Sequence, residues 1–179
     1  MNALRRALLL ACVLPAACAH RPPVPGAELP LRLSPASLGR ELTLQQRMKV
    51  TVRGHSQQFD VALEVDAAAV RVAILAFGQV LARLSWDGRE LREERVRGWP
   101  PAITGALVLR DLQLVHWPEA AIRAALPAGW AIEADERGRE LRLAGRTMIR
   151  VQHPTPETAE LENLAAGYRI QLQSWGRTA

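Results

Sequence analysis

The stretch from Glu41 to Arg53 alternates between apolar and polar residues with a period of two. Successive side chains of a β-strand point to opposite faces, so this period predicts an antiparallel strand with one buried and one solvated face. Its apolar positions are Leu42, Leu44, Met48, Val50 and Val52, and Gln46 is the only polar residue among them. Such a strand needs neighbours that bury the same face, and this predicts a sheet packed on one core.

The same alternation recurs along the chain and predicts a series of short antiparallel strands. They are expected at 59–65, 70–74, 80–86, 130–135, 139–144, 146–152 and 168–175, with a polar strand after the Asp-Gly hairpin signal at 87–88. Turns are expected at 54–57 and 76–79. The stretch 153–163 is polar, and we predict no strand there.

A helical insert of about 102–126 is predicted between the two groups of strands. Leu107, Val108, Leu112 and Val115 lie close to a helical spacing, although part of this stretch also fits a strand. Pro118 suits the first turn of a second helix. Strands, then helices, then strands indicate an α+β fold, a curved antiparallel sheet or half-barrel with helices lidding its apolar side. The pattern leaves open whether side chains or a ligand fill the space between them.

The first twenty residues have the order of a secretory signal, with two arginines, an apolar run and small residues. The run is about half of the ~20 residues that a membrane-spanning helix needs. Bacterial lipoprotein leaders are similar, with a small pair at 16–17 directly before Cys18, the expected lipidation site. Pro15 departs from the usual aliphatic residue. Cys12 is a second candidate, and ordinary cleavage after Ala19 is the alternative.

These features predict a lipoprotein-type signal peptide at 1–17, a proline-rich tether at 18–37 and one domain at 38–176. The tether contains five prolines and no periodicity, which suits an extended spacer. The formal charge is +5, too small and too interspersed for a nucleic-acid partner. Both cysteines lie in the leader, which excludes a disulfide framework and a cysteine nucleophile in the domain.

No pattern of catalytic or metal-ligating residues stands out. The four histidines do not have a metal-binding spacing, and we expect neither a metal nor a cofactor. Asp111 and His116 are interpreted as a pair on a helix surface, and no catalytic residue is predicted. Trp99 and Trp117 bracket the helical insert, where they either seal the core or line a cavity for an acyl chain.

Three segments carry a family resemblance: LSWDG (84–88), LRDLQLVHWP (109–118) and ELENLAAGYRIQL (160–172). In their order and rough spacing, over about 40–176, the chain resembles an uncharacterised family of short bacterial outer-membrane lipoproteins. That family is similar in predicted fold to the lipoprotein receptor LolB and its periplasmic partner LolA. Its members occur near fatty-acid and aryl-polyene synthesis genes.

The resemblance implies a half-barrel that is not an enzyme. Such a protein binds and transfers lipids, acyl chains or lipoproteins at the periplasmic face of the outer membrane. It implies a monomer held by a lipid anchor, palmitate for example, with the membrane, an acylated molecule and a periplasmic carrier protein as partners. Phe77 and Gly78 would correspond to an exposed loop with which LolB contacts the membrane, although Phe77 could equally pack into the core. The expected cavity residues are Leu44, Met48, Leu63, Ile74, Leu84, Trp99, Leu112 and Trp117.

Two other functions are compatible with the residues. A lipid-anchored scaffold of an envelope complex would have an exposed apolar patch in place of a cavity. A periplasmic hydrolase of acyl esters would require a nucleophile and a base, for which Asp111 and His116 are the nearest candidates.

Overall fold

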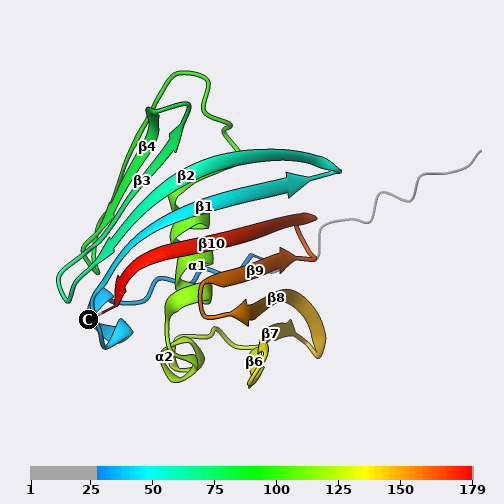
Figure 1. Cartoon of the computed structure of the whole chain (residues 1–179). Helices are drawn as coiled ribbons and strands as arrows, with labels where there is room; N and C mark the ends of the chain where they lie inside the picture. The colour runs from blue at the N-terminus through cyan, green and yellow to red at the C-terminus, as the bar shows by residue number, and fades with distance from the viewer. Residues whose placement is uncertain (1–27, 179) are drawn as a thin grey trace, which may run out of the picture.

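The computed structural model describes residues 28–178, which form one ten-stranded antiparallel sheet curved around a helix (Figure 1). The helices are α1 (Gly105–His116) and α2 (Glu119–Ala124), after a short 3-10 helix at Pro35–Leu38. The strands are β1 (Leu42–Val52), β2 (His55–Val65), β3 (Val70–Ala76), β4 (Gln79–Trp86), β5 (Leu91–Arg95), β6 (Trp130–Asp135), β7 (Gly138–Leu143), β8 (Arg146–Thr155), β9 (Thr158–Asn163) and β10 (Tyr168–Thr178).

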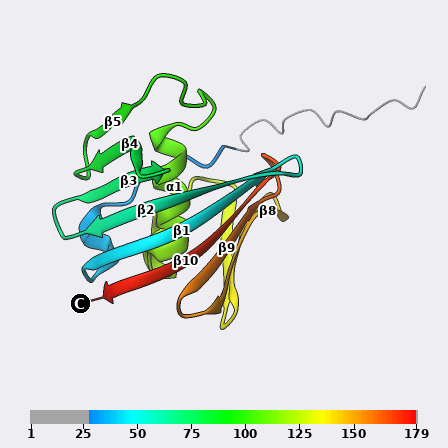
Figure 2. The same ribbon diagram turned by 45° about the horizontal axis from the view of Figure 1, so that its top comes forward.

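The strand order is β5-β4-β3-β2-β1-β10-β9-β8-β7-β6. Consecutive strands therefore pair as hairpins, while β1 and β10 close the middle of the sheet. The sheet stays open, with β5 and β6 at its edges, and the helices that connect these edges lie on its concave side (Figures 1 and 2). The predicted curved antiparallel sheet with a helical insert is thus confirmed in outline.

Three of the five two-residue hairpin turns in residues 28–178 have a positive φ at both positions, and the sequence predicted them only in part. Arg53-Gly54, Phe77-Gly78 and Ala144-Gly145 all have positive φ angles, between 49° and 81°. Two residues of positive φ match the right-handed twist of the flanking strands. Because this turn needs only two residues, β2 begins at His55, and the turn expected at 54–57 was wrong.

Strand β9 was missed because its outward face carries only polar residues and its inward face includes one. Ala159, Leu161 and Asn163 are buried, whereas the residues between them face outward. The outward-facing Glu160 and Glu162 pair with arginines of the neighbouring strands. The alternation was present in the sequence, and the polar composition concealed it.

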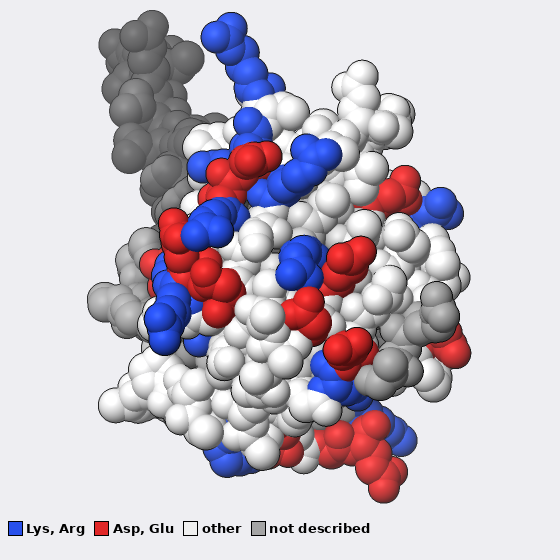
Figure 3. All heavy atoms as spheres, turned by 90° about the vertical axis from the view of Figure 1, so that its left-hand side faces the viewer, with Lys and Arg blue, Asp and Glu red and all other residues white. Residues whose placement is uncertain are grey.

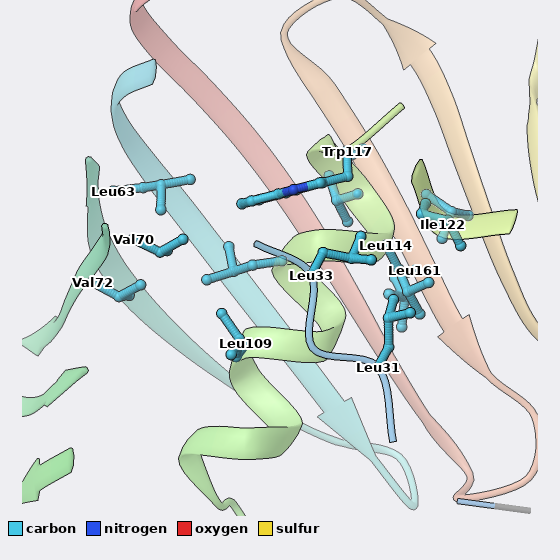
Figure 4. Packing of buried hydrophobic residues seen from close by; sticks show 14 of the residues in the cluster. Leu31, Leu33, Leu63, Val70, Val72, Leu109, Leu114, Trp117, Ile122 and Leu161 are labelled. Carbon is cyan, nitrogen blue, oxygen red and sulfur yellow. The ribbon is translucent and has the colours of Figure 1, made fainter. Parts of the chain in front are cut away.

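The tether predicted at 18–37 is wrong over its described part. Leu29, Leu31 and Leu33 are each at most 5% exposed, and they pack between α1 and the sheet (Figure 4). The buried Gln113 of α1 binds both backbone groups of Leu33, accepting from its N–H at 2.9 Å and donating to its carbonyl at 2.8 Å. Alternate leucines give this segment an apolar face that proline content did not reveal. Residues 18–27, with Cys18, lie outside the described residues.

None of the helices in residues 28–178 has the length and hydropathy that crossing a membrane requires.

Candidate functional site

A cavity of about 610 Å³ lies between α1 and the concave face of the sheet. Most of its lining is apolar and comes from strands β1, β2, β3, β8, β9 and β10, from α1, and from the loop before α1. Its apolar lining includes Met48, Val61, Ile74, Trp99, Val108 and Leu112.

Four of the eight predicted cavity residues line this space: Met48, Ile74, Trp99 and Leu112. The other four belong to the packed core. Leu63, Leu84 and Trp117 are at most 6% exposed, and Leu44 is packed against the same core. They lie nearer the end of the sheet where β1 begins, and there the N-terminal segment fills the space beside α1 (Figure 4). The sequence did not predict that this segment packs against the concave face of the sheet.

The cavity opens at the end of the sheet where β1 ends and β10 begins. Its lining there includes Val52, Arg146 and Leu164, and Val52 and Leu164 are 44% and 45% exposed. Gln46 lines the cavity six residues earlier on β1, about 20 Å away at the usual strand rise of ~3.3 Å per residue. The cavity therefore runs along β1 from an open mouth to a closed inner end.

A buried polar cluster forms part of the cavity wall near the mouth. Arg110 donates from Nε and Nη2 to Oδ1 of Asp111, at 2.9 and 2.7 Å. The Tyr168 hydroxyl donates to the other carboxylate oxygen at 2.6 Å and accepts from Arg110 at 2.6 Å. Asn163 donates to the same hydroxyl at 3.3 Å. These bonds fasten α1 to β9 and β10, and all four residues line the cavity.

Burial sets the protonation of this cluster. It raises the pKa of the Asp111 carboxyl above its usual value, against the opposing effect of Arg110 and the Tyr168 hydroxyl. Burial and the neighbouring Asp111 also raise the pKa of Tyr168, which keeps its phenol protonated as a donor. The cluster thus presents a paired, nearly neutral polar surface inside an apolar cavity.

Gln46 and His116 lie at the inner end. Gln46 donates from Nε2 to the Ser174 hydroxyl at 2.8 Å, and the same nitrogen lies 3.4 Å from Nε2 of His116. Its Oε1 is buried and has no hydrogen-bond partner among residues 28–178. Gln46, the one polar residue on the apolar face of β1, therefore places a polar group at the closed end of the cavity.

The His116 imidazole is held neutral. Burial, with His153, Arg40 and Arg139 nearby, lowers its pKa from 6.5 to about 4. The unfolded chain then binds a proton that the folded chain does not, once the pH falls below about 6.5. Stability from this group is complete above that pH and is lost as the pH falls towards 4.

We expect the free energy of unfolding to fall by about 2–3 kcal/mol from this group alone between about pH 6.5 and pH 4.5. His116→Gln should remove most of that loss, and urea unfolding of both proteins at the two pH values measures it. An equal loss in the parent and the variant would show that His116 does not carry the effect.

Asp111 and His116 do not form the predicted surface pair. Asp111 is 6% exposed and engaged by Arg110 and Tyr168, while His116 contacts Gln46 at the other end of the cavity. No hydrogen bond joins the two within the described part of the chain. Residues 28–178 contain no group of three or more His, Cys, Asp or Glu arranged to hold a metal ion.

Phe77 is fully exposed, at 104%, at the tip of the β3–β4 hairpin. It does not pack into the core, so the corresponding alternative from the sequence is wrong. Its contact with a membrane stays a prediction.

Residues 43–176 match the protein family of unknown function DUF3261. The chain belongs to this family. The DUF3261 match spans both helices and the whole cavity lining apart from Glu28. This agrees with the resemblance to an uncharacterised family, whose lipoprotein character and gene neighbourhood stay predictions.

No curated protein matches the chain. Among solved structures, it is similar to a LolA superfamily protein from Nitrosomonas europaea, with a TM-score of 0.43. The two are 9% identical, and the alignment covers 82% of this chain and 93% of that chain.

The sequence missed the polar part of the lining. Arg110, Asp111, Asn163 and Tyr168 lie within the segments that carry the family resemblance, yet no local pattern assigns them to a cavity. Two adjacent charged residues on a helix normally face solvent. A charged pair inside an otherwise apolar stretch of that helix was the only available signal.

Proposed function

We propose that the protein binds the acyl chain of a lipid or acylated molecule in its cavity and releases it through the mouth. The observation that carries this proposal is the apolar cavity itself, closed at one end and open at the other. Its volume of about 610 Å³ lies within the ~300–1,000 Å³ typical of small-molecule pockets.

The energetics favour an aliphatic ligand. Each buried CH₂ contributes ~0.8 kcal/mol, so a chain of ~14 methylenes contributes about 11 kcal/mol before the costs of ordering it. The lining presents few polar groups that would need a partner, and those near the mouth already bind one another. A tail along β1 would place a polar head beside Arg110 and the exposed Arg146.

The location of this activity is part of the proposal. The leader pattern supports export and a lipid on Cys18, which holds the domain at the periplasmic face of the outer membrane. A carrier protein or the membrane supplies the acylated molecule, and the binding step needs no cofactor. A scaffold with a solid interior is less well supported, because the interior contains a cavity.

Filling the cavity tests the proposal. Val108 of α1 lines the cavity, whereas Ala106 on the same helix does not. We expect Val108→Trp to lower affinity for a fluorescent fatty acid at least tenfold, because its indole occupies the space of several methylenes. Ala106→Trp is the matched control and should bind like the parent.

Native mass spectrometry of the purified protein provides a second measurement, since it detects co-purified lipid directly. A parent protein that binds no fatty acid or acylated molecule in either assay would overturn the proposed function. Equal binding by Val108→Trp and the parent would place the ligand outside the cavity.

A further inference from the structure

Five segments lie at the end of the sheet towards which the cavity opens. The strand registers place there the turns at 53–54, 77–78, 144–146 and 164–167, together with the loop 96–104 that follows β5. We call this surface the mouth end. The β1–β2 turn lies at its tip in Figures 1 and 2, on the side away from the C-terminus.

Large apolar side chains are exposed mainly at the mouth end. Val52, Phe77, Val96 and Leu164 lie there, each at least 44% exposed. Among the described residues, the one further exposed large apolar side chain is Trp175, on β10 near the opposite end. Val52 and Leu164 line the mouth itself, whereas Phe77 and Val96 lie outside the cavity lining, on shorter strands that end level with Asp60 of β2. We call these four side chains the apolar tips.

Charge is distributed just as unevenly. The charged residues of the five mouth-end segments are Arg53, Arg97 and Arg146, and these segments contain no acidic residue. None of these arginines makes an ion pair within residues 28–178. Glu28, in the N-terminal segment, is the exposed acidic residue of the cavity lining.

The opposite end carries both signs of charge. Its turns contain two arginines, Arg89 and Arg137, and five acidic residues, which are Asp66, Asp87, Glu90, Glu136 and Glu157. Figure 3 shows this side of the molecule, with acidic and basic groups intermingled. The sheet is therefore electrostatically polarised along its strands: the mouth-end segments carry three positive charges and no negative one, whereas the opposite turns carry two positive and five negative charges.

Phe77 is unfavourable for the isolated fold in two ways. Its φ of 51° lies in the left-handed region, where a bulky residue is strained and asparagine or glycine is favoured. Its ring also gains nothing from burial, because it is fully exposed. A phenylalanine with both a strained backbone and an exposed ring is explained if a binding partner covers the ring.

We infer that the mouth end docks on a bilayer surface that contains anionic phospholipid. The apolar tips enter the headgroup region, and Arg53, Arg97 and Arg146 contact lipid phosphates. A membrane is favoured over an acidic protein because the apolar groups sit on separate hairpin tips, whereas a protein interface buries a continuous core. This inference deepens the proposed function, and its consequence for ligand release rests on that function. An acyl chain would then pass between the cavity and the bilayer without crossing water.

Flotation with lipid vesicles tests the inference. The full chain carrying Cys18→Ser, which removes the predicted anchor, is mixed with phosphatidylcholine vesicles with or without phosphatidylglycerol. We expect binding to the anionic vesicles that weakens with added salt. Each surface arginine contributes about fivefold, so Arg53→Gln, Arg97→Gln and Arg146→Gln together should lower the affinity about 100-fold.

The matched control combines Arg40→Gln, Arg89→Gln and Arg137→Gln at the opposite end, which removes the same net charge and should change binding little. Phe77→Asn should weaken binding about tenfold while the variant melts no lower than its parent. This separates loss of contact from loss of folding.

Equal losses in the two arginine triples would overturn the inference, since net charge alone would then explain binding. No binding to anionic vesicles would also overturn it, and would favour an acidic protein as the partner. Val108→Trp should still bind vesicles, so failure of the proposed cavity function and failure of membrane docking are distinguishable.

Discussion

Replacing Arg110 with Met is expected to lower the free energy of unfolding by about 3–5 kcal/mol. Arg110 and Asp111 are both at most 6% exposed, and the arginine donates two hydrogen bonds to the carboxylate. Its removal leaves a buried negative charge whose remaining hydrogen bond in this cluster comes from Tyr168. Chemical denaturation of the purified variant measures the loss.

A compensated variant tests whether the unpaired charge is the cause. The triple variant combines Arg110→Met, Asp111→Leu and Tyr168→Phe, and so removes the polar groups of the cluster other than Asn163. The Asn163 side chain still accepts from the Ala166 N–H. Replacing a buried ion pair with apolar residues of similar volume is often neutral or stabilising. We therefore expect the triple variant to recover most of the stability lost by the single change. A triple variant as unstable as Arg110→Met would show that the cluster, and not the unpaired charge, holds α1 on the sheet.

Trp117→Ala is expected to destabilise the fold by about 3–5 kcal/mol, the usual range for a large aromatic residue deleted from a core. Trp117 is fully buried, and its indole N–H donates to the Ser37 hydroxyl at 3.0 Å. Its carbonyl also accepts from Arg139 of β7 at 2.7 Å. The side chain thus joins α1 to the N-terminal segment, and both lose packing when it is removed.

Trp175→Ala is the control for this change. Trp175 is 48% exposed on β10, and substitutions at such sites usually change stability by no more than about 0.5 kcal/mol. Thermal or urea unfolding of the two variants side by side measures the difference. Similar losses for both would contradict the position of Trp117 in the core.

The strands were predictable because their information is local. In β1 apolar side chains alternate with polar ones, and in β3 and β4 a large apolar or buried residue recurs at every second position. Each of these strands was expected within a few residues of its observed bounds. The helical insert was also expected, from the near-helical spacing of apolar residues in 102–117 and from Pro118 at the start of the second helix. Strand β9 was missed because polar residues fill its outward face and Asn163, which donates to Tyr168 of the next strand, occupies one position of its inward face.

The site was less predictable than the fold. Half of the expected cavity residues proved to be core, because the segment at 29–33 occupies one part of the interior. Nothing in the sequence shows where an extended segment lies once the sheet has curved. The pairing of Arg110 and Asp111 with Tyr168, 57 residues after the aspartate, was equally hidden.

The sequence by itself determined that this chain forms an antiparallel sheet with one apolar face and a helical insert, because side-chain periodicity acts between neighbouring residues. Only the tertiary structure decided what fills the concave side: leucines of the N-terminal segment at one end and an open cavity at the other. It also decided that the exposed apolar tips and three arginines lie at the same end of the sheet as the mouth. Those arrangements arise from contacts between distant segments, whose geometry depends on the twist and curvature of the whole sheet.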